Sequence, residues 1–231
     1  MEKTAMIKKT VFKAALFAAA TLAPCAAFAW PVNVSVGGST LGLGVQVATA
    51  IVPGTLDVRA GFSSATFNGN ARFSSGGNDI PFTGSLRLQG IPILLDYYPF
   101  HGAFRLSGGM VVNENDLTAV ASGGSGTYTI NGDTYTAQQV GTLTGKLGWR
   151  RIAPYIGIGW GMKAARHSGL SMGFDLGVMF TGSPTVSLHS SNPTNNQQLA
   201  KDVAAAQATA NSKVSPVRYW PVIGLTFGYA F

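Results

Sequence analysis

The stretch YWPVIGLTFGYAF, residues 219–231, alternates strictly between two kinds of side chain. From Ile223 to Phe231 every second residue is apolar or aromatic, whereas the residues between them are Gly, Thr or Ala. A period of two places the apolar set on one face of a β-strand and the small set on the other. Such a strand suits a sheet whose apolar face meets either a protein core or lipid.

The same alternation recurs in seven earlier segments: 32–36, 41–51, 56–63, 85–97, 104–112, 156–160 and 170–180. These runs are near the ~9–11 residues that a tilted strand needs to cross a bilayer. In the segment 85–97 the alternation changes phase after Gly90, from Leu86 and Leu88 to Ile91 and Ile93. Because Gly90 and Pro92 both weaken regular pairing, we expect a β-bulge there.

The connections between these segments alternate in length. Residues 52–55, 98–102 and 162–168 form short connections, whereas residues 74–81, 115–145 and 181–216 form longer ones. Only the first connection on the long side, near residues 37–38, is short. A barrel with both termini on one side of a membrane requires this parity, whereas a soluble sandwich does not.

Composition supports a membrane barrel. Charged residues make up only 11% of the chain, which is too few for an ordinary soluble surface, and Gly occupies 30 positions. After the N-terminal region, no segment reaches the ~18 uninterrupted apolar residues of a membrane helix. The predicted fold is therefore all-β, an eight-stranded antiparallel transmembrane β-barrel with extended outer loops.

The N-terminus carries the features of a secretory signal peptide. Lys8, Lys9 and Lys13 precede an apolar run over residues 14–28, which closes on an Ala-Phe-Ala cleavage site. We therefore divide the chain into a signal peptide, residues 1–29, and a barrel domain, residues 30–231. Cys25, the one cysteine, leaves with the signal, so the mature chain has no disulfide, thiol nucleophile or Cys-based metal site.

Cleavage also removes four lysines and one glutamate, which reduces the net charge from +7 to +4. The remaining chain has no basic run interleaved with aromatics, so nucleic acid is not an expected partner. Export of a barrel points to the outer membrane, with both termini periplasmic. The last strand, with Phe227, Tyr229 and Phe231, resembles the signal that the outer-membrane assembly machinery recognises. The expected partners are that machinery, outer-membrane lipid and lipopolysaccharide.

The alternation directs six charged side chains into the lumen: Asp57, Arg59, Arg87, Asp96, Arg105 and Asp175. The interior of an eight-stranded barrel is just wide enough to be filled by side chains. Isolated charges there would be unfavourable, so we expect them to pair. Two interpretations stay open, namely a salt-bridged plug and a narrow polar path for small solutes.

Two of the long connections carry local structure. TYTINGDTYT, residues 127–136, contains an Asn-Gly pair that predicts a hairpin turn. Residues 195–213 are Ala-rich, with Leu199, Val203 and Ala206 at helical spacing, and predict a short amphipathic helix. Each element suits either partner binding or a polar cap over the rim.

Three stretches carry a resemblance to a known family: TINGDTY, IAPYIGIGWG (152–161) and GFDLGVMFTGSPTVSL (173–188). In this order and spacing they resemble outer-membrane proteins of the CarO type, over the C-terminal half of the chain. The resemblance implies a small outer-membrane barrel associated with uptake of ornithine and other basic amino acids, and with carbapenem susceptibility. It carries no functional motif, so no site residue is transferred.

The sequence thus favours a narrow channel for small solutes such as basic amino acids. The alternative is a closed structural or surface-interaction barrel that acts through its outer loops. A third is a lipid A-modifying hydrolase, which would need Ser, His and a carboxylate. Of His101, His167 and His189 only the last, followed by Ser190, falls at the outer end. Sequence adjacency does not supply the required geometry, so we expect no enzyme, and no metal-ligand spacing or cofactor motif is present.

Overall fold

The computed structural model describes residues 31–231 apart from residues 76–77, 123–126, 165–167 and 193, and the side chains of residues 71–80 are not described. The expected signal peptide lies outside the described residues. None of the described helices is both long and apolar enough to cross a membrane.

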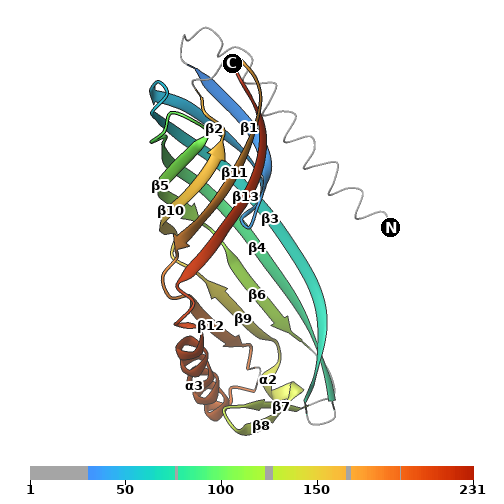
Figure 1. Cartoon of the computed structure of the whole chain (residues 1–231). Coiled ribbons are helices and arrows are strands. Elements are labelled where there is room, and N and C mark those ends of the chain that lie inside the picture. Colours follow the sequence, from blue (N-terminus) through green and yellow to red (C-terminus); the bar gives the residue numbers. More distant parts are fainter. Residues whose placement is uncertain (1–30, 76–77, 123–126, 165–167, 193) are drawn as a thin grey trace, which may run out of the picture.

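Eight antiparallel strands close into a barrel, as the alternation predicted (Figure 1). In ring order they are β1 (Val32–Ser39), β2 (Gly42–Val52), β3 (Leu56–Ser75), β4 (Asn78–Tyr97), β5 (Phe104–Asn113), β10 (Ile152–Gly161), β11 (Gly169–Phe180) and β13 (Tyr219–Ala230). The ring closes where β13 pairs with β1, with Val36 opposite Phe227.

The apolar face of the alternation lies on the outside of the barrel. Ile223, Leu225 and Phe227 of β13 are exposed, whereas Gly224 and Thr226 between them are buried. Aromatic pairs lie towards the two ends of this outer surface, Phe180 with Tyr219 at one end and Tyr229 with Phe231 at the other. An apolar band between aromatic girdles is typical of a membrane barrel.

The two ends of the barrel differ. One end, the short-turn end, holds residue 31, Phe231, the connections 53–55 and 98–103, and residues 162–164 after β10. The opposite end, the extended end, holds the tight turn at Thr40 and Leu41 and three long excursions. That turn lies three residues beyond 37–38, which belong to β1, so its predicted position was wrong.

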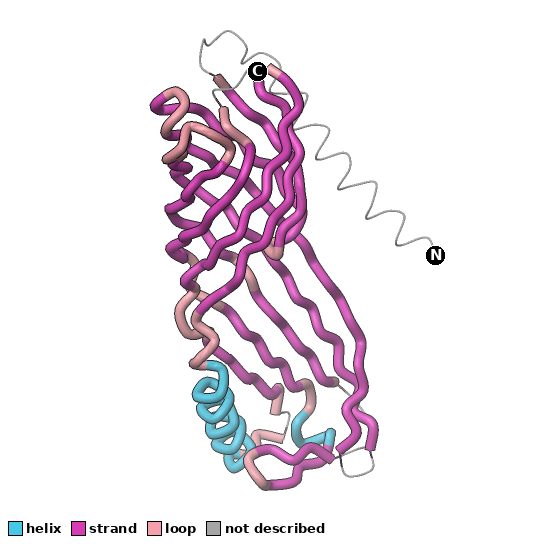
Figure 2. Tube along the Cα trace, in the orientation of Figure 1, coloured by secondary structure: helices cyan, strands magenta, loops and turns pink. Residues whose placement is uncertain are grey.

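Half of the barrel wall continues past the extended end as an open sheet (Figures 1 and 2). The strands β3 and β4 each run for 20 residues, and β6 (Asp116–Ala121), β9 (Leu143–Gly148) and β12 (Thr185–Ser190) join them in the order β3-β4-β6-β9-β12. The register with β4 carries over from Gly90↔Asn113 in β5 to Arg87↔Asp116 in β6. Stretches that the sequence presented as loops therefore contain three further strands. Each has six residues and lies in a stretch between the strands that were expected from the sequence.

The predicted bulge at Gly90 is wrong. The pairs Ala60↔Ile93 and Ser63↔Gly90 follow one unbroken register, and pairing is only interrupted between them, where Pro92 has no N–H to donate. Leu86 and Leu88 therefore lie on the same face of β4 as Leu94, which is the luminal face. They do not face lipid, as the sequence had suggested.

A small cap with its own core closes the far end of the open sheet. The predicted hairpin forms from β7 (Thr127–Ile130) and β8 (Asp133–Thr136), and the positive φ of Asn131 and Gly132 suits a type I′ turn. Short α2 (Ala137–Val140) follows, and α3 (Gln197–Val214) confirms the predicted helix. The cap core consists of Tyr128, Ile130, Tyr135, Val140, Leu199 and Val203.

The helix α3 also protects the edge of the sheet. Asn211 donates from Nδ2 to the carbonyl of Val186 (3.0 Å) and accepts the N–H of Val186 (2.7 Å). Gln207 accepts the N–H of Leu188 (2.8 Å). These amides satisfy three backbone groups of β12 in place of a neighbouring strand, which reduces the capacity of that edge to pair with other chains.

Candidate functional site: the barrel lumen

Two arginines and two aspartates from four strands meet in the middle of the lumen. Arg59 comes from β3, Asp96 from β4, Arg105 from β5 and Asp175 from β11. Each occupies an inward position of the alternation, and all four are buried, with at most 6% of the residue surface exposed. We call these four residues the central network.

Arg59 binds both carboxylates. Its Nη1 and Nη2 donate to Oδ2 and Oδ1 of Asp175, each at 3.0 Å, in a two-pronged arrangement. Its Nη2 also donates to Asp96 Oδ1 (3.1 Å), and its Nε lies 2.8 Å from Asp96 Oδ2. That last contact is an ion pair but not a hydrogen bond, because the N–H is poorly aligned with the oxygen.

Arg105 completes the network from the opposite side. Its Nη2 donates to Asp175 Oδ1 (2.7 Å), its Nε lies 3.7 Å from Asp96 Oδ1, and its Nη1 donates to the carbonyl of Gly161. Each carboxylate therefore lies against two guanidinium groups, and the four charges sum to zero. Gln46 accepts from Arg59 and Ser107 donates to Asp96. These two partners were missed, although both are polar residues at inward positions.

The other two residues of the expected network lie elsewhere. Asp57 is buried in the lumen, but its Oδ2 accepts the N–H of Ala164 (2.8 Å), and no ion pair joins it to a described arginine. Arg87 lies outside the barrel, which corrects the expectation that it faces the lumen. Its side chain is 49% exposed, donates to Gln89 Oε1 (2.7 Å from Nη2) and lies 3.6 Å from Glu114 Oε2. The absence of a bulge at Gly90 explains its outward direction.

Glycines make room for the large luminal side chains. A Cβ at Gly157 or Gly177 would overlap the hydroxyl end of Tyr155, and one at Gly159 would lie 2.8 Å from Arg105 Cζ. The repeated glycines of GIGWG therefore accommodate Tyr155 and Arg105 in a narrow barrel.

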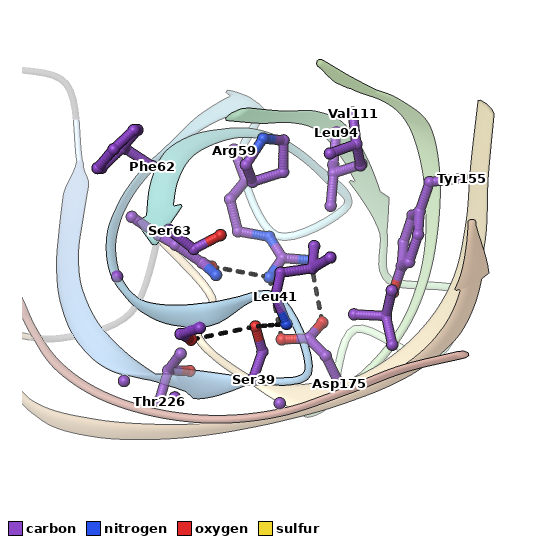
Figure 3. A pocket seen from close by; sticks show the side chains of 18 residues that line it. Ser39, Leu41, Arg59, Phe62, Ser63, Leu94, Val111, Tyr155, Asp175 and Thr226 are labelled. Atoms are coloured by element: carbon purple, nitrogen blue, oxygen red, sulfur yellow. Dashed lines mark hydrogen bonds and ion pairs between the residues drawn. The ribbon is translucent and has the colours of Figure 1, made fainter. Parts of the chain in front are cut away.

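Towards the extended end an apolar cluster, the outer plug, fills the lumen: Leu41, Leu94, Val111, Ala153, Tyr155, Met179 and Val222. Leu41 is 5% exposed, so its expected lipid-facing position is wrong, because the turn after β1 folds it inward. A cavity of about 50 Å³ separates this plug from Arg59 and Asp175 (Figure 3). That volume is sufficient for a small number of water molecules.

Towards the short-turn end the chain itself fills the lumen. Residues 162–164, which follow β10 and which we call the inner plug, are all buried. Ala164 packs against Ala48 and Ala50, and Lys163 Nζ donates to the carbonyl of His101 (2.7 Å). The lumen is thus closed at three levels, by the inner plug, the central network and the outer plug.

The described residues form no recognisable catalytic or metal centre. His101 Nε2 lies 3.4 Å from Thr55 Oγ1, and His189 lies opposite Thr144 in the sheet, so neither contact is part of a Ser–His–carboxylate arrangement. Among the described residues no group of three or more His, Cys, Asp or Glu could hold a metal ion. His167 lies outside the described residues.

No protein-family model matches the sequence, and no curated protein matches it either. Among solved structures the chain is similar to the crystal structures of CarO2 and CarO from Acinetobacter baumannii, with TM-scores of 0.56 and 0.54. Each likeness covers 87% of this chain and 98% of that chain, at 16% sequence identity. The chain has the CarO-type fold. At this identity the likeness establishes the barrel architecture, and function has to be argued from this chain's own residues.

Proposed function

We propose that this CarO-type barrel is an integral outer-membrane protein, with both termini periplasmic, that holds a folded platform outside the cell. In this proposal the lumen is a closed, rigid anchor and the working surface is the open sheet with its cap. The apolar outer band, the two aromatic girdles and the signal peptide expected from the sequence support the membrane location.

The closed lumen carries the proposal. A standing path for cationic solutes needs carboxylates that are free to bind them, whereas Asp96 and Asp175 each already lie against two guanidinium groups. The cavity of about 50 Å³ next to them has room for water and not for an amino acid. A charge-balanced, buried ion network suits a rigid plug, because moving any member would leave a charge without its partner.

The platform, which is the open sheet with its cap, is the reason to assign the function of the protein to the extended end. A tight turn of two residues suffices to join β1 and β2 there. The connections before β10 and β13 instead build strands, a helix, a hairpin and a separate apolar core. Closing a barrel does not require any of these. The proposal assigns no catalytic step to the protein.

Planar bilayers containing the purified mature protein test the closed anchor. The wild type should give no unitary conductance. Arg105→Ala, which removes a fully buried side chain from the central network, should give intermittent openings. Lys213→Ala, an exposed change on α3, should behave as the wild type. Reproducible conductance of the wild type would overturn the closed anchor and leave the barrel assignment in place.

The second candidate is a gated narrow channel for small solutes such as basic amino acids. It is favoured by an inner plug that few polar contacts hold in place. Uptake into proteoliposomes separates the candidates. For a channel, Asp96→Asn or Asp175→Asn should reduce uptake of basic amino acids and leave neutral ones unaffected. Unchanged uptake in both folded variants removes the lumen from any transport mechanism.

A further inference from the structure

The boundary between the barrel and the open sheet is a belt of strand breaks, which we call the waist. It comprises residues 114–115 between β5 and β6, 149–151 between β9 and β10, 181–184 between β11 and β12, and 215–218 between α3 and β13. These breaks carry Arg150, Arg151 and Arg218, and Arg87 projects outward from β4 opposite Asp116. We call these four residues the waist arginines.

The waist arginines are fixed by their backbones, and their side chains remain exposed. Asn113 donates from Nδ2 to the carbonyl of Arg150 (3.1 Å), and Thr181 donates to the carbonyl of Arg218 (3.2 Å). A Cβ on Gly182 would lie 3.3 Å from Arg150 Cδ, so the stem of Arg150 crosses the outer end of β11. The side chain of Arg151 is 77% exposed.

Few negative charges compensate these arginines. Glu114 lies 3.6 Å from both Arg87 and Arg151, and Asp116 is the cross-strand neighbour of Arg87. Neither Arg150 nor Arg218 has an ion pair among the described residues. The waist therefore has an excess of positive charge, greatest at the ends of β10 and β13.

The lipid-facing band ends directly below this belt. Ile152, Phe180 and Tyr219 are the last outward side chains of β10, β11 and β13, and the rings of Phe180 and Tyr219 are 5.6 Å apart. Aromatic girdles lie at the level of lipid headgroups. All exposed Lys and Arg side chains among the described residues belong to the extended end, where they are Arg87, Lys146, Arg150, Arg151, Lys201, Lys213 and Arg218.

We infer that the waist arginines form a binding site for the phosphate groups of lipopolysaccharide in the outer leaflet. Guanidinium groups match phosphate with paired N–H donors and keep their charge at any physiological pH. Their position just above an aromatic girdle places these donors at headgroup depth. Glu114 competes with phosphate for Arg87 and Arg151. The inference rests on the proposed outer-membrane location.

Binding of purified lipopolysaccharide to the full mature protein in nanodiscs tests the inference, with dephosphorylated lipopolysaccharide as the matched probe. A basic residue near an anionic surface contributes about fivefold in affinity, so Arg150→Gln/Arg151→Gln/Arg218→Gln should weaken binding about 100-fold. Glu114→Gln should strengthen it several-fold. The control Lys201→Gln/Lys213→Gln changes two exposed cations on α3 and should have little effect.

The outcomes separate the two levels of the argument. The phosphate site is wrong if the wild type inserts into bilayers but binds both probes with equal affinity, or if the triple variant binds as well as the wild type. Either result leaves the outer-membrane proposal intact. Failure of the wild type to insert, or its recovery outside the outer-membrane fraction of cells, overturns both. Heat-dependent gel mobility of each variant verifies that the barrel is folded.

Discussion

Replacing Arg59 by methionine tests whether the central network stabilises the barrel as a charge-balanced unit. The change removes the guanidinium and retains much of the apolar stem. Asp96 and Asp175 then share Arg105 alone, which leaves one excess negative charge among groups that are at most 6% exposed. Removing one partner of a buried ion pair commonly lowers the free energy of unfolding by about 3–5 kcal/mol. Because water in the adjacent cavity can solvate the carboxylates, we expect about 3 kcal/mol.

A compensating change should recover part of this loss. Asp96→Asn alone leaves an excess positive charge, whereas Arg59→Met/Asp96→Asn leaves the Arg105–Asp175 pair, 2.7 Å apart, and a neutral lumen. The double variant should therefore be less destabilised than the sum of the single variants. For groups within one ion network the coupling free energy is typically about 0.5–3 kcal/mol, and we expect about 2 kcal/mol here.

Urea unfolding of the barrel in phospholipid vesicles, followed by tryptophan fluorescence, measures each free energy. Lys213→Met, which replaces an exposed cation outside the barrel, controls for the loss of a positive charge. Strict additivity of the single variants, within about 0.5 kcal/mol, would refute the charge-balanced network. The four residues would then act as independent space-filling groups.

Three other predictions concern separate parts of the molecule. Phe174→Arg on the lipid face should lower the free energy of unfolding by about 2–4 kcal/mol, and equal tolerance of Asn195→Arg in the same assay would contradict the membrane assignment. The Tyr135 hydroxyl donates to Asp202, which lowers the pKa of Asp202 below its usual 3.8 and raises the pKa of Tyr135 to about 12. The stabilisation of the cap by Asp202 is thus fully present above pH 3.8 and is lost as the pH falls through the lowered pKa of Asp202. The stabilisation by Tyr135 is fully present below pH 10 and is lost as the pH rises through about 12. Amide exchange in α3 should accelerate at both extremes, and Asp202→Asn should abolish the acid step. Ala164→Leu should crowd the inner plug and lower the free energy of unfolding by about 1–3 kcal/mol, whereas an unchanged value would show that the plug yields freely.

The sequence was sufficient to predict the barrel because lipid imposes a simple rule. Every strand that crosses a bilayer must present apolar side chains outward at a period of two. Ile223, Leu225 and Phe227 obey this rule. The alternation of short and long connections further indicated that the strands close into a ring with both termini at one end. The hairpin at Asn131-Gly132 was equally predictable, because few dipeptides suit a turn with two positive φ angles.

The central network was only partly predictable. Alternation identified Arg59, Asp96, Arg105 and Asp175 as inward, but which of them meet depends on strand register and tilt, and these quantities are set by the whole barrel. Asp57 shows the difference. It faces inward as expected, yet it binds the backbone of Ala164, because the connection after β10 folds into the lumen. No local pattern in that connection indicates such a fold.

The outward direction of Arg87, which the sequence had placed in the lumen, indicates where the proposed membrane-spanning part of β4 ends. Within the barrel, β4 directs Ile91 and Ile93 outward, because lipid lies outside. Beyond Gly90 the apolar residues of the same strand, Leu86 and Leu88, lie on the luminal face instead, which fits an outer surface that meets water. One row of side chains on the luminal face crosses all five strands in register: Phe67, Leu86, Leu117, Leu147 and Val186. Phe67 and Leu117 remain exposed. The change of the face that carries the apolar side chains needs no irregularity in the backbone. In the sequence it produces the same pattern as a bulge. It falls at the level of the waist arginines. In the proposed outer-membrane placement, the change of phase at Gly90 therefore marks the membrane boundary at the extended end, and Arg87 faces outward just beyond it.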